Sequence, residues 1–235
     1  MIYVTGDLHG DKEQINIYLE KLSELNKSDV LIIAGDFGIP WWTEKISYWK
    51  YYQDIKLLKK LANAPFTLCF VDGNHENYDL LKMYPLEKKW GGLVQNIEGV
   101  YHLLRGELYT IDGNRIFTFG GATSTDKRYR TEHISWWEEE NASQEEKDKG
   151  IAVLERTQWN VDYVITHQAP EQFYQVFVQA MIGNSKMNCI TQAYLTEICN
   201  RLTYKKWYFG HYHADINSEP VKCRLLFNDI VELGK

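Results

Sequence analysis

Five short turns along the chain carry side chains that can bind metal ions, and each turn follows an apolar run typical of a buried strand. The turns read "VTGDLHG", "AGDFG", "DGNHEN", "ITHQAP" and "FGHYH". Their candidate donors are Asp7, His9, Asp36, Asn74, His167, His211 and His213, and His75 lies beside Asn74 in the third turn. Five of the seven histidines fall in these turns. Imidazole, carboxylate and amide groups together suit a divalent transition metal, so the pattern predicts a metal site.

Taken one at a time, these motifs are weak signals. A lone Asp-x-His is more often a capped turn, and a single strand-end histidine such as His167 is as often structural. In an extended segment His211 and His213 point the same way, which suits chelation, although one of them could simply be packed. All five motifs together, each at the end of a strand candidate, favour a shared metal site.

The elements that must position these turns alternate between short strands and longer helices over the first third of the chain. "IYVT" precedes a helix with apolar spacing from about Lys12 to Asn26, and "DVLIIAGD" has the apolar centre of a strand covered on both faces. A helix rich in Trp and Tyr then runs to about Ala62, before the third apolar run "APFTLCFVDGN". This βαβαβ order predicts a largely parallel sheet. Because ligands bind at the carboxyl ends of the strands of such sheets, we expect the five turns to converge on one edge.

Beyond Leu93 the sequence changes to short strand candidates separated by turn residues. "VYHLLR", "ELYTI" and "RIFTFGG" predict a second sheet that is rich in hairpins. An acidic helix is expected from about Ser143 to Thr157, with Ser143 as its N-cap and Glu146 three residues on. A strand at "VDYVITHQAP", a helix from about Thr191 to Leu202, and strands at "KWYFGHYH" and "CRLLFN" follow.

We expect one domain over residues 1–235, with an irregular loop insertion at about 121–144. This segment lacks clear periodicity, and long irregular loops in compact domains tend to be functional or disordered. Its Tyr129, Trp136 and Trp137 favour an ordered loop.

The composition excludes several classes of protein. The 26 basic and 32 acidic side chains give a formal net charge of -6, so no overall positive field attracts nucleic acid or an anionic membrane, although a local basic patch could still bind a polyanion. We expect neither a secretion signal nor a membrane span, because no apolar run approaches roughly 18 to 20 residues. The four cysteines form no CxxC pair. They therefore predict free thiols and a cytoplasmic protein.

In their order along the chain, Asp-x-His, Gly-Asp, Gly-Asn-His-Glu, His and Gly-His-x-His resemble the motif set of the calcineurin-like metallophosphoesterases, from Gly6 to His213. The resemblance implies a four-layer αββα sandwich, an α/β fold in which two packed mixed β-sheets are flanked by helices. It also implies two divalent metal ions. One ion would be held by Asp7, His9, Asp36 and His213, and the other by Asp36, Asn74, His167 and His211. Asp36 would bridge them, since a carboxylate carries negative charge and two donor atoms, and His75 would stay off the metals as the catalytic residue.

The donor set also constrains the metal and its chemistry. It contains nitrogen and oxygen but no sulfur, so we expect manganese first, then iron, zinc, cobalt or nickel. Two such ions can clamp the attacking and leaving oxygens of a phosphate ester and lower the pKa of a bound water. His75 could hydrogen-bond the phosphoryl group or protonate the leaving oxygen, an effect of about 100- to 10,000-fold. Glu76 or Asp72 could orient its ring, or both could be solvated acids of the turn.

The residues that would bind the substrate are less well defined. Protein Ser/Thr phosphatases and diadenosine tetraphosphatases extend the second motif to Gly-Asp-x-x-Asp-Arg-Gly, but this chain reads "GDFGIPW" and lacks their phosphate-binding arginine. Arg128 or Arg130 in the irregular loop could replace it, since a planar guanidinium suits phosphate, or both could be exposed loop charges. Two pairs, Trp41–Trp42 and Trp136–Trp137, could stack a nucleobase or pack in the core.

Three functions remain open from the sequence. The first is a phosphodiesterase or phosphatase that acts on a small phosphorylated molecule such as a nucleotide. The second is a nuclease or nucleic-acid cyclic phosphodiesterase, which would need a basic groove. The third is a metal-binding scaffold without catalysis, against which the full set of donors argues. No membrane partner is expected, and the oligomeric state stays open.

Overall fold

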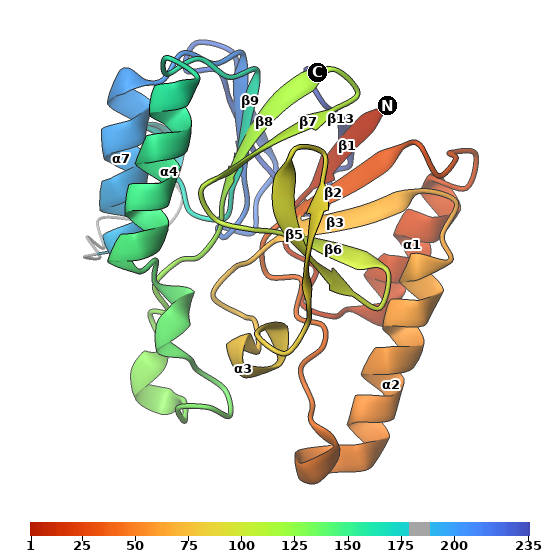
Figure 1. Cartoon of the computed structure of the whole chain (residues 1–235). Coiled ribbons are helices and arrows are strands. Elements are labelled where there is room, and N and C mark those ends of the chain that lie inside the picture. The colour runs from red at the N-terminus through yellow and green to blue at the C-terminus, as the bar shows by residue number, and fades with distance from the viewer. Residues whose placement is uncertain (179–188) are drawn as a thin grey trace.

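The computed structural model describes residues 1–178 and 189–235 of the chain. In this part, the strands form two mixed sheets (Figure 1). The first contains, in spatial order, β13 (Val231–Glu232), β1 (Ile2–Thr5), β2 (Val30–Ala34), β3 (Thr67–Val71), β6 (Val100–Leu103), β5 (Gly92–Ile97) and β4 (Leu86–Lys89). The second contains β11 (Ile216–Ser218), β12 (Cys223–Leu225), β10 (Lys206–Phe209), β9 (Tyr163–Thr166), β8 (Asn114–Phe119) and β7 (Glu107–Ile111).

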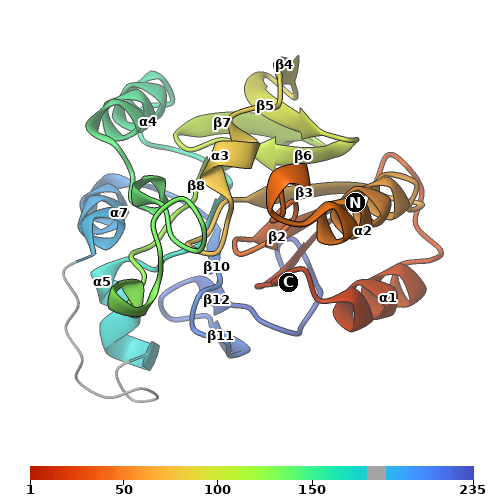
Figure 2. The same ribbon diagram turned by 90° about the horizontal axis from the view of Figure 1, so that it is seen from below.

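Helices flank both sheets (Figure 2). Against the first lie α1 (Lys12–Lys21) and α2 (Glu44–Ala62), and against the second lie α4 (Gln144–Arg156) and α7 (Ile190–Arg201). The connections contain the short helices α3 (Tyr78–Leu81), α5 (Glu171–Phe173), η1 (Lys127–Tyr129), η2 (Glu138–Glu140) and η3 (Tyr174–Val178). The α/β sandwich of two mixed sheets flanked by helices, which the resemblance implies, is therefore confirmed.

Buried apolar side chains on both faces of β2 show how the layers are held together. Val30, Ile32 and Ala34 belong to the core between the two sheets, whereas Leu31 and Ile33 belong to the core beneath α1 and α2. All five side chains are buried. A strand with this pattern must be covered on both faces, as the sequence predicts.

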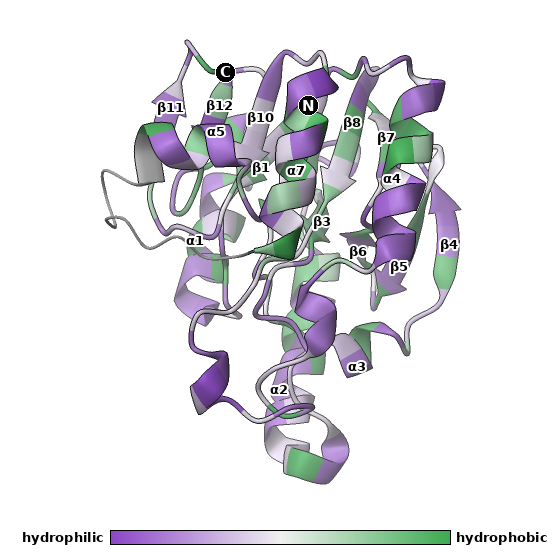
Figure 3. Ribbon diagram, turned by 90° about the vertical axis from the view of Figure 1, so that its left-hand side faces the viewer, coloured by the Kyte–Doolittle hydropathy of each residue, from purple (hydrophilic) through white to green (hydrophobic). Residues whose placement is uncertain are grey.

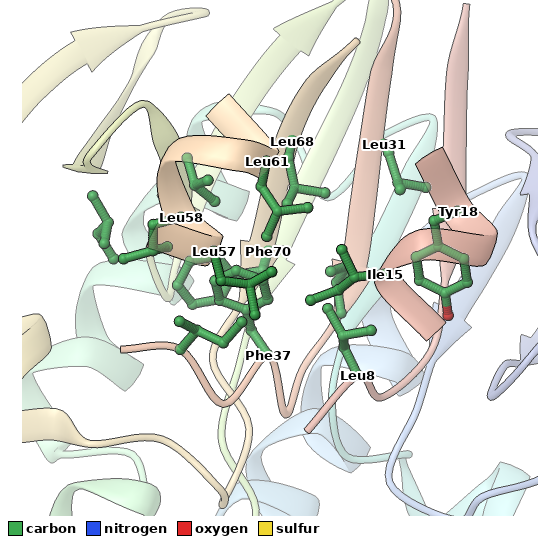
Figure 4. Packing of buried hydrophobic residues seen from close by; sticks show 14 of the residues in the cluster. Leu8, Ile15, Tyr18, Leu31, Phe37, Leu57, Leu58, Leu61, Leu68 and Phe70 are labelled. Carbon is green, nitrogen blue, oxygen red and sulfur yellow. The ribbon is translucent and has the colours of Figure 1, made fainter. Parts of the chain in front are cut away.

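Each outer layer closes its own hydrophobic core. Beneath α1 and α2, Ile15 and Leu58 pack in the same cluster as Phe70 of β3 (Figure 4). On the other side of the molecule, Leu154 of α4 and Leu195 of α7 share a cluster with residues of β8, β9 and β10. Figure 3 shows α4 and α7 side by side in front of this second sheet.

Parallel pairing at the centre of both sheets sets the position of the turns. β1, β2 and β3 run parallel in the first sheet, and β8, β9, β10 run parallel in the second. The chain returns through α1 between β1 and β2 and through α2 between β2 and β3, which is the predicted βαβαβ order. The carboxyl ends of neighbouring parallel strands therefore lie at the same edge of each sheet.

The prediction that all three strand candidates after Leu93 join a second sheet is wrong for β6. This strand pairs with β3 and β5 in the first sheet, and only β7 and β8 join the second. β4, which forms a hairpin with β5, was not predicted. Turn residues specify local antiparallel pairing but not the sheet to which a hairpin belongs. The three residues 104–106 carry the chain from one sheet to the other.

The first helix is shorter than its apolar spacing predicts. α1 ends at Lys21 instead of near Asn26, because Leu22 and Leu25 pack on the same core from the turn that follows. The N-terminus of α4 agrees with the prediction, since Ser143 and Glu146 form a capping box.

Segment 121–144 packs against the body of the protein. Trp136 and Trp137 are buried, and Trp137 Nε1 donates to Asp79 Oδ2 at 2.8 Å. The four cysteines are free. None of the helices in the described part of the chain combines the length and the hydropathy that crossing a bilayer requires.

Candidate metal centre

The five predicted turns meet where parallel strands of both sheets end. Asp7 follows β1, Asp36 follows β2, Asn74 follows β3, His167 follows β9, and His211 and His213 follow β10. Two groups of side chains could each hold a metal ion, because the donor atoms within a group lie within 4.8 Å of one another. They are Asp7, His9 and His213, and Asp7, Asp36 and His167.

The first group lies at the solvent-exposed side of the centre. His213 Nε2 lies 3.1 Å from Asp7 Oδ2 and also 3.1 Å from His9 Nε2. His9 Nε2 is 3.9 Å from the same Asp7 oxygen. The Asp7 carboxylate is buried, whereas both imidazoles are partly exposed. A ligand could therefore reach this group from solvent.

The second group is fully buried. His167 Nε2 lies 3.3 Å from Asp36 Oδ1 and 3.1 Å from Asn74 Oδ1. The His211 ring is adjacent, with its centroid 4.9 Å from that of His167. The backbone amide of His211 donates to Asp7 Oδ1 at 2.9 Å, which joins the last turn to the first.

The buried charges shift the pKa values of the two neighbouring histidines in opposite directions. Burial opposes the charged form of His167, but Asp36 and Asp7 outweigh it and raise its pKa to about 10. Burial and the charge of His167 lower the pKa of His211 to about 4. Asp36 also stays ionised, since the facing histidines overcome the effect of burial and lower its pKa. The centre thus combines ionised carboxylates with a neutral imidazole at His211, whereas His167 must release a proton before its Nε2 can bind a cation.

Hydrogen bonds to the far side of two donors fix their orientation. His167 Nδ1 lies 2.9 Å from the carbonyl oxygen of Ala34, so this nitrogen carries the proton and Nε2 faces the centre. Asn74 Nδ2 donates to Ser124 Oγ at 3.1 Å, which leaves Asn74 Oδ1 toward the centre. Ser124 in turn donates through Oγ to the buried carboxylate of Glu140 at 2.6 Å.

Ser124 and Glu140 were not identified from the sequence. Both lie in the irregular segment 121–144, where no periodicity relates them to Asn74. The available signal was composition alone, a small polar residue after "GGAT" and a run of three acids. Neither feature indicates a partner on another strand.

Two glycines are required by the close approach of the donors. A Cβ at Gly35 would lie 2.1 Å from His167 Nδ1, and one at Gly73 would lie 2.0 Å from Asp36 Oδ1. Gly35 also has a φ of +96°, which disfavours other residues. These glycines let the donors of neighbouring turns approach each other.

The chemistry of the donor set fits divalent cations. Asp7 Oδ2 is buried and, among the described residues, lacks a hydrogen-bond partner of acceptable geometry. The Nε2 atoms of His9 and His213 face each other at 3.1 Å, where one can donate a hydrogen bond to the other. A cation could be bound there by Asp7 Oδ2 together with the Nε2 lone pairs of His9 and His213.

His75 lies beside this centre and contacts the irregular loop. Its backbone amide donates to Asp36 Oδ1 at 2.7 Å, and its ring centroid is 5.0 Å from that of His9. Arg130 Nη2 lies 2.9 Å from His75 Nε2, and Arg130 Nε is paired with Asp126 at 2.8 Å. Burial lowers the pKa of His75, and Arg130 lowers it further against the opposing charge of Asp36. Of the two candidate arginines, the structure brings Arg130 to the site.

Arg128 has different surroundings. It is exposed, and its guanidinium carbon lies 4.6 Å from the ring centroid of Tyr129. The structure therefore does not bring Arg128 together with the predicted donors.

The interpretation of Glu76 and Asp72 needs correction, because both carboxylates are buried and neither is bonded to the His75 ring. Glu76 accepts from the backbone amides of Phe37 and Gly38 at 2.7 and 3.0 Å. It thereby holds the turn that carries Asp36. Asp72 instead accepts from Arg105 and His102, at 2.8 and 3.0 Å, at the end of β3.

The two Trp pairs differ in exposure, although the rings of Trp41 and Trp137 pack edge-to-face with their centroids 5.4 Å apart. Trp136 and Trp137 pack in the protein, whereas Trp41 and Trp42 are partly exposed and line a cavity of about 600 Å³. His9 and His75 line the same cavity, so it opens directly beside the candidate metal centre.

Comparison with known proteins agrees with this geometry. A family model described as calcineurin-like phosphoesterase matches residues 1–215. A search of curated proteins found no relative that matches the chain. Members of the matched family are generally metal-dependent phosphoesterases, which supports a hydrolase that uses divalent ions on phosphorylated substrates. On the basis of this match, the chain belongs to the calcineurin-like phosphoesterase family.

Proposed function

We propose that the chain is a hydrolase of phosphate esters that depends on two divalent metal ions and acts as a phosphodiesterase or phosphatase on small phosphorylated molecules. The observation that carries this proposal is the meeting of the predicted donors from five separate turns around buried carboxylates. A structural role alone would not require the buried carboxylates of Asp7 and Asp36 to lie together among these histidines.

The proposed ligand sets are Asp7, His9, Asp36 and His213 for one ion, and Asp36, Asn74, His167 and His211 for the other. The two oxygens of Asp36 support its role as the bridge: Oδ1 lies 3.3 Å from His167 Nε2, and Oδ2 lies 3.8 Å from His9 Nε2. When bound, two divalent ions would polarise the phosphate and lower the pKa of a bound water. Manganese is the ion we expect first, from the nitrogen and oxygen donors.

The residues beside the centre would act on the substrate directly. Hydrolysis adds water to phosphorus and breaks the P–O bond to the leaving alcohol, so the leaving oxygen must receive a proton. We propose that His75 hydrogen-bonds the phosphoryl group or supplies this proton. Arg130, which contacts His75 at 2.9 Å, would bind a phosphate oxygen with its planar guanidinium.

The test is hydrolysis of bis-p-nitrophenyl phosphate and p-nitrophenyl phosphate with manganese, then with EDTA. We expect activity that EDTA abolishes. Asp36→Asn should lower kcat by more than about 100-fold, since even the contacts that support metal ligands contribute about 10- to 100-fold. Asp112→Asn, at an exposed carboxylate, is the matched control. Metal binding without hydrolysis of either ester would refute the proposal and favour a scaffold.

Variants of the loop arginines test the substrate-binding role. Arg130→Ala should lower kcat/KM by about 10- to 100-fold, the effect of losing a charge-assisted hydrogen bond. Arg128→Ala, on the same loop but exposed, should leave kcat/KM unchanged. Equal effects of the two substitutions would exclude a specific role for Arg130.

A further inference from the structure

A second cavity adjoins the one beside the metal centre. It has a volume of about 400 Å³ and is lined by residues of α1 and α2, among them Lys56, Lys59 and Lys60. Lys12 and Gln53 line both cavities, so the two are neighbours along the cleft between these helices. We call the combined surface the α1–α2 groove. It leads from His9 and His75 away from the metal centre.

The α1–α2 groove is strongly basic in a protein with a net charge of -6. It is lined by five lysines, Lys12, Lys50, Lys56, Lys59 and Lys60, all of which are exposed. Asp54 is the one acidic residue among the groups that line either cavity. Its Oδ2 accepts from the backbone amides of Trp41 and Trp42, and burial raises its pKa.

These lysines are available to an external anion. The ion pairs of the described residues involve other lysines of the chain and none of these five. Lys60 donates to the neutral side chain of Asn16 at 2.6 Å, and Lys50 Nζ lies 3.8 Å from the ring centroid of Trp42. In the described part of the chain, none of these five lysine charges is therefore held in an ion pair.

Aromatic rings stand at the end of the groove next to the metal centre. Trp41, Trp42 and Trp49 line the cavity there, and Trp49 is 69% exposed. Tyr52 is also exposed, and its ring centroid lies 6.5 Å from that of Trp49. Exposed aromatic side chains combined with a basic groove are the features by which proteins bind single-stranded nucleic acid, through stacked bases and the phosphate backbone.

We propose that the α1–α2 groove binds a single-stranded nucleic acid, with one phosphodiester at the metal centre and the following phosphates along the lysines. Hydrolysis of the bound strand rests on the proposed function and extends its substrates from small phosphorylated molecules to an oligonucleotide. The binding itself does not depend on that function. From Lys50 to Lys60 the axis of α2 rises about 15 Å, at about 1.5 Å per residue. A stacked strand that rises about 3.4 Å per nucleotide would place about four nucleotides along this distance.

The binding test uses a fluorescein-labelled thymidine oligonucleotide of about twelve nucleotides, with fluorescence anisotropy in EDTA so that no hydrolysis occurs. Four phosphate contacts predict a slope of about -2.8 for log K against log salt, which is roughly a 50-fold loss of affinity between about 50 and 200 mM salt. The variant Lys59→Glu/Lys60→Glu should bind at least about tenfold more weakly. Its matched control, Lys88→Glu/Lys222→Glu, reverses two exposed lysines outside the groove and should bind like the unmodified chain.

Chain length separates this proposal from binding of a mononucleotide. Affinity should rise from a thymidine dinucleotide to an oligonucleotide of about four to five nucleotides and then level off. Three results would overturn the inference. They are equal affinity for oligonucleotides of all lengths, a slope of log K against log salt near zero, and an equal loss of oligonucleotide affinity in both double variants.

Hydrolysis of bis-p-nitrophenyl phosphate distinguishes the two proposals. Unchanged hydrolysis by Lys59→Glu/Lys60→Glu with weakened oligonucleotide binding supports the groove. Hydrolysis without any oligonucleotide binding overturns the groove and leaves the phosphoesterase. Oligonucleotide binding through these lysines without hydrolysis supports the groove and overturns the reaction.

Discussion

Replacing Ser124 by Ala tests whether the irregular loop prepares the metal centre. The Ser124 hydroxyl accepts from Asn74 Nδ2 at 3.1 Å and donates to Glu140 at 2.6 Å, and all three side chains are buried. Ser124→Ala leaves the Asn74 amide without this acceptor and frees it to turn. An unsatisfied buried donor costs about 1–3 kcal/mol, so the unfolding free energy of the metal-free protein should fall by about that amount.

The effect on metal binding should be separate and measurable. Loss of a contact that orients a metal ligand typically weakens metal affinity by about 10- to 100-fold. With the metal in excess, its contribution to the unfolding free energy should therefore fall by about 1.4 to 2.7 kcal/mol. Urea denaturation in EDTA and in excess manganese gives this contribution by difference.

Thr123→Ala provides the control for this measurement. Thr123 lies on the same loop and bonds to Asn141, so its loss removes a hydroxyl without touching a proposed ligand. The manganese-dependent gain in the unfolding free energy should be the same as in the unmodified chain. If Ser124→Ala also retains the full gain, the view that Ser124 orients Asn74 for the metal is wrong.

Three further predictions concern the framework of the site. Arg105→Met should lower the unfolding free energy by about 3–5 kcal/mol in urea denaturation, because the buried Asp72 carboxylate would lose its guanidinium partner and keep only His102 and Tyr78. Arg115→Met, at a half-exposed pair, should cost less than about 1 kcal/mol. Glu76→Gln should weaken manganese binding, as measured by calorimetry. The Gln side chain has one acceptor oxygen in place of two, so one of the backbone amides of Phe37 and Gly38, in the turn after β2, loses its acceptor. An unchanged manganese affinity would contradict this prediction. Trp137→Ala should cost about 3–5 kcal/mol in the same denaturation assay. Trp137→Phe should cost less, about 1–3 kcal/mol, because a phenyl ring fills part of the space of the indole while the hydrogen bond to Asp79 is lost.

The sequence predicts those elements of the fold whose structure depends on residues close to them in the chain. The apolar run of β2 and the capping box of α4 depend on neighbouring residues, and both agree with the structure. β6 was assigned to the wrong sheet because its partner, β3, lies about 30 residues earlier in the chain and no local signal identifies it. Apolar spacing also cannot distinguish the end of α1 from a packed turn, as Leu22 and Leu25 show.

The same distinction applies to the candidate site. The proposed donors lie directly after strands, so strand order and the parallel arrangement bring them together and the sequence predicts their meeting. Ser124, Glu140 and Arg130 reach the site from a loop whose path depends on tertiary packing, including that of Trp137. Residue type alone identifies Arg130 as a candidate phosphate-binding residue. It does not show that Arg130 contacts His75.

The net charge of the whole chain does not describe the charge of one local surface. A value of -6 argues against a polyanionic partner only if the charges are evenly spread. The five lysines of the α1–α2 groove lie beside one partly buried carboxylate, that of Asp54, so the field within the groove opposes that of the whole molecule. Because electrostatic screening limits each exposed charge to about 8–10 Å at moderate salt, the nearby lysines dominate over distant acids. The groove can therefore attract a phosphate backbone that the protein as a whole repels.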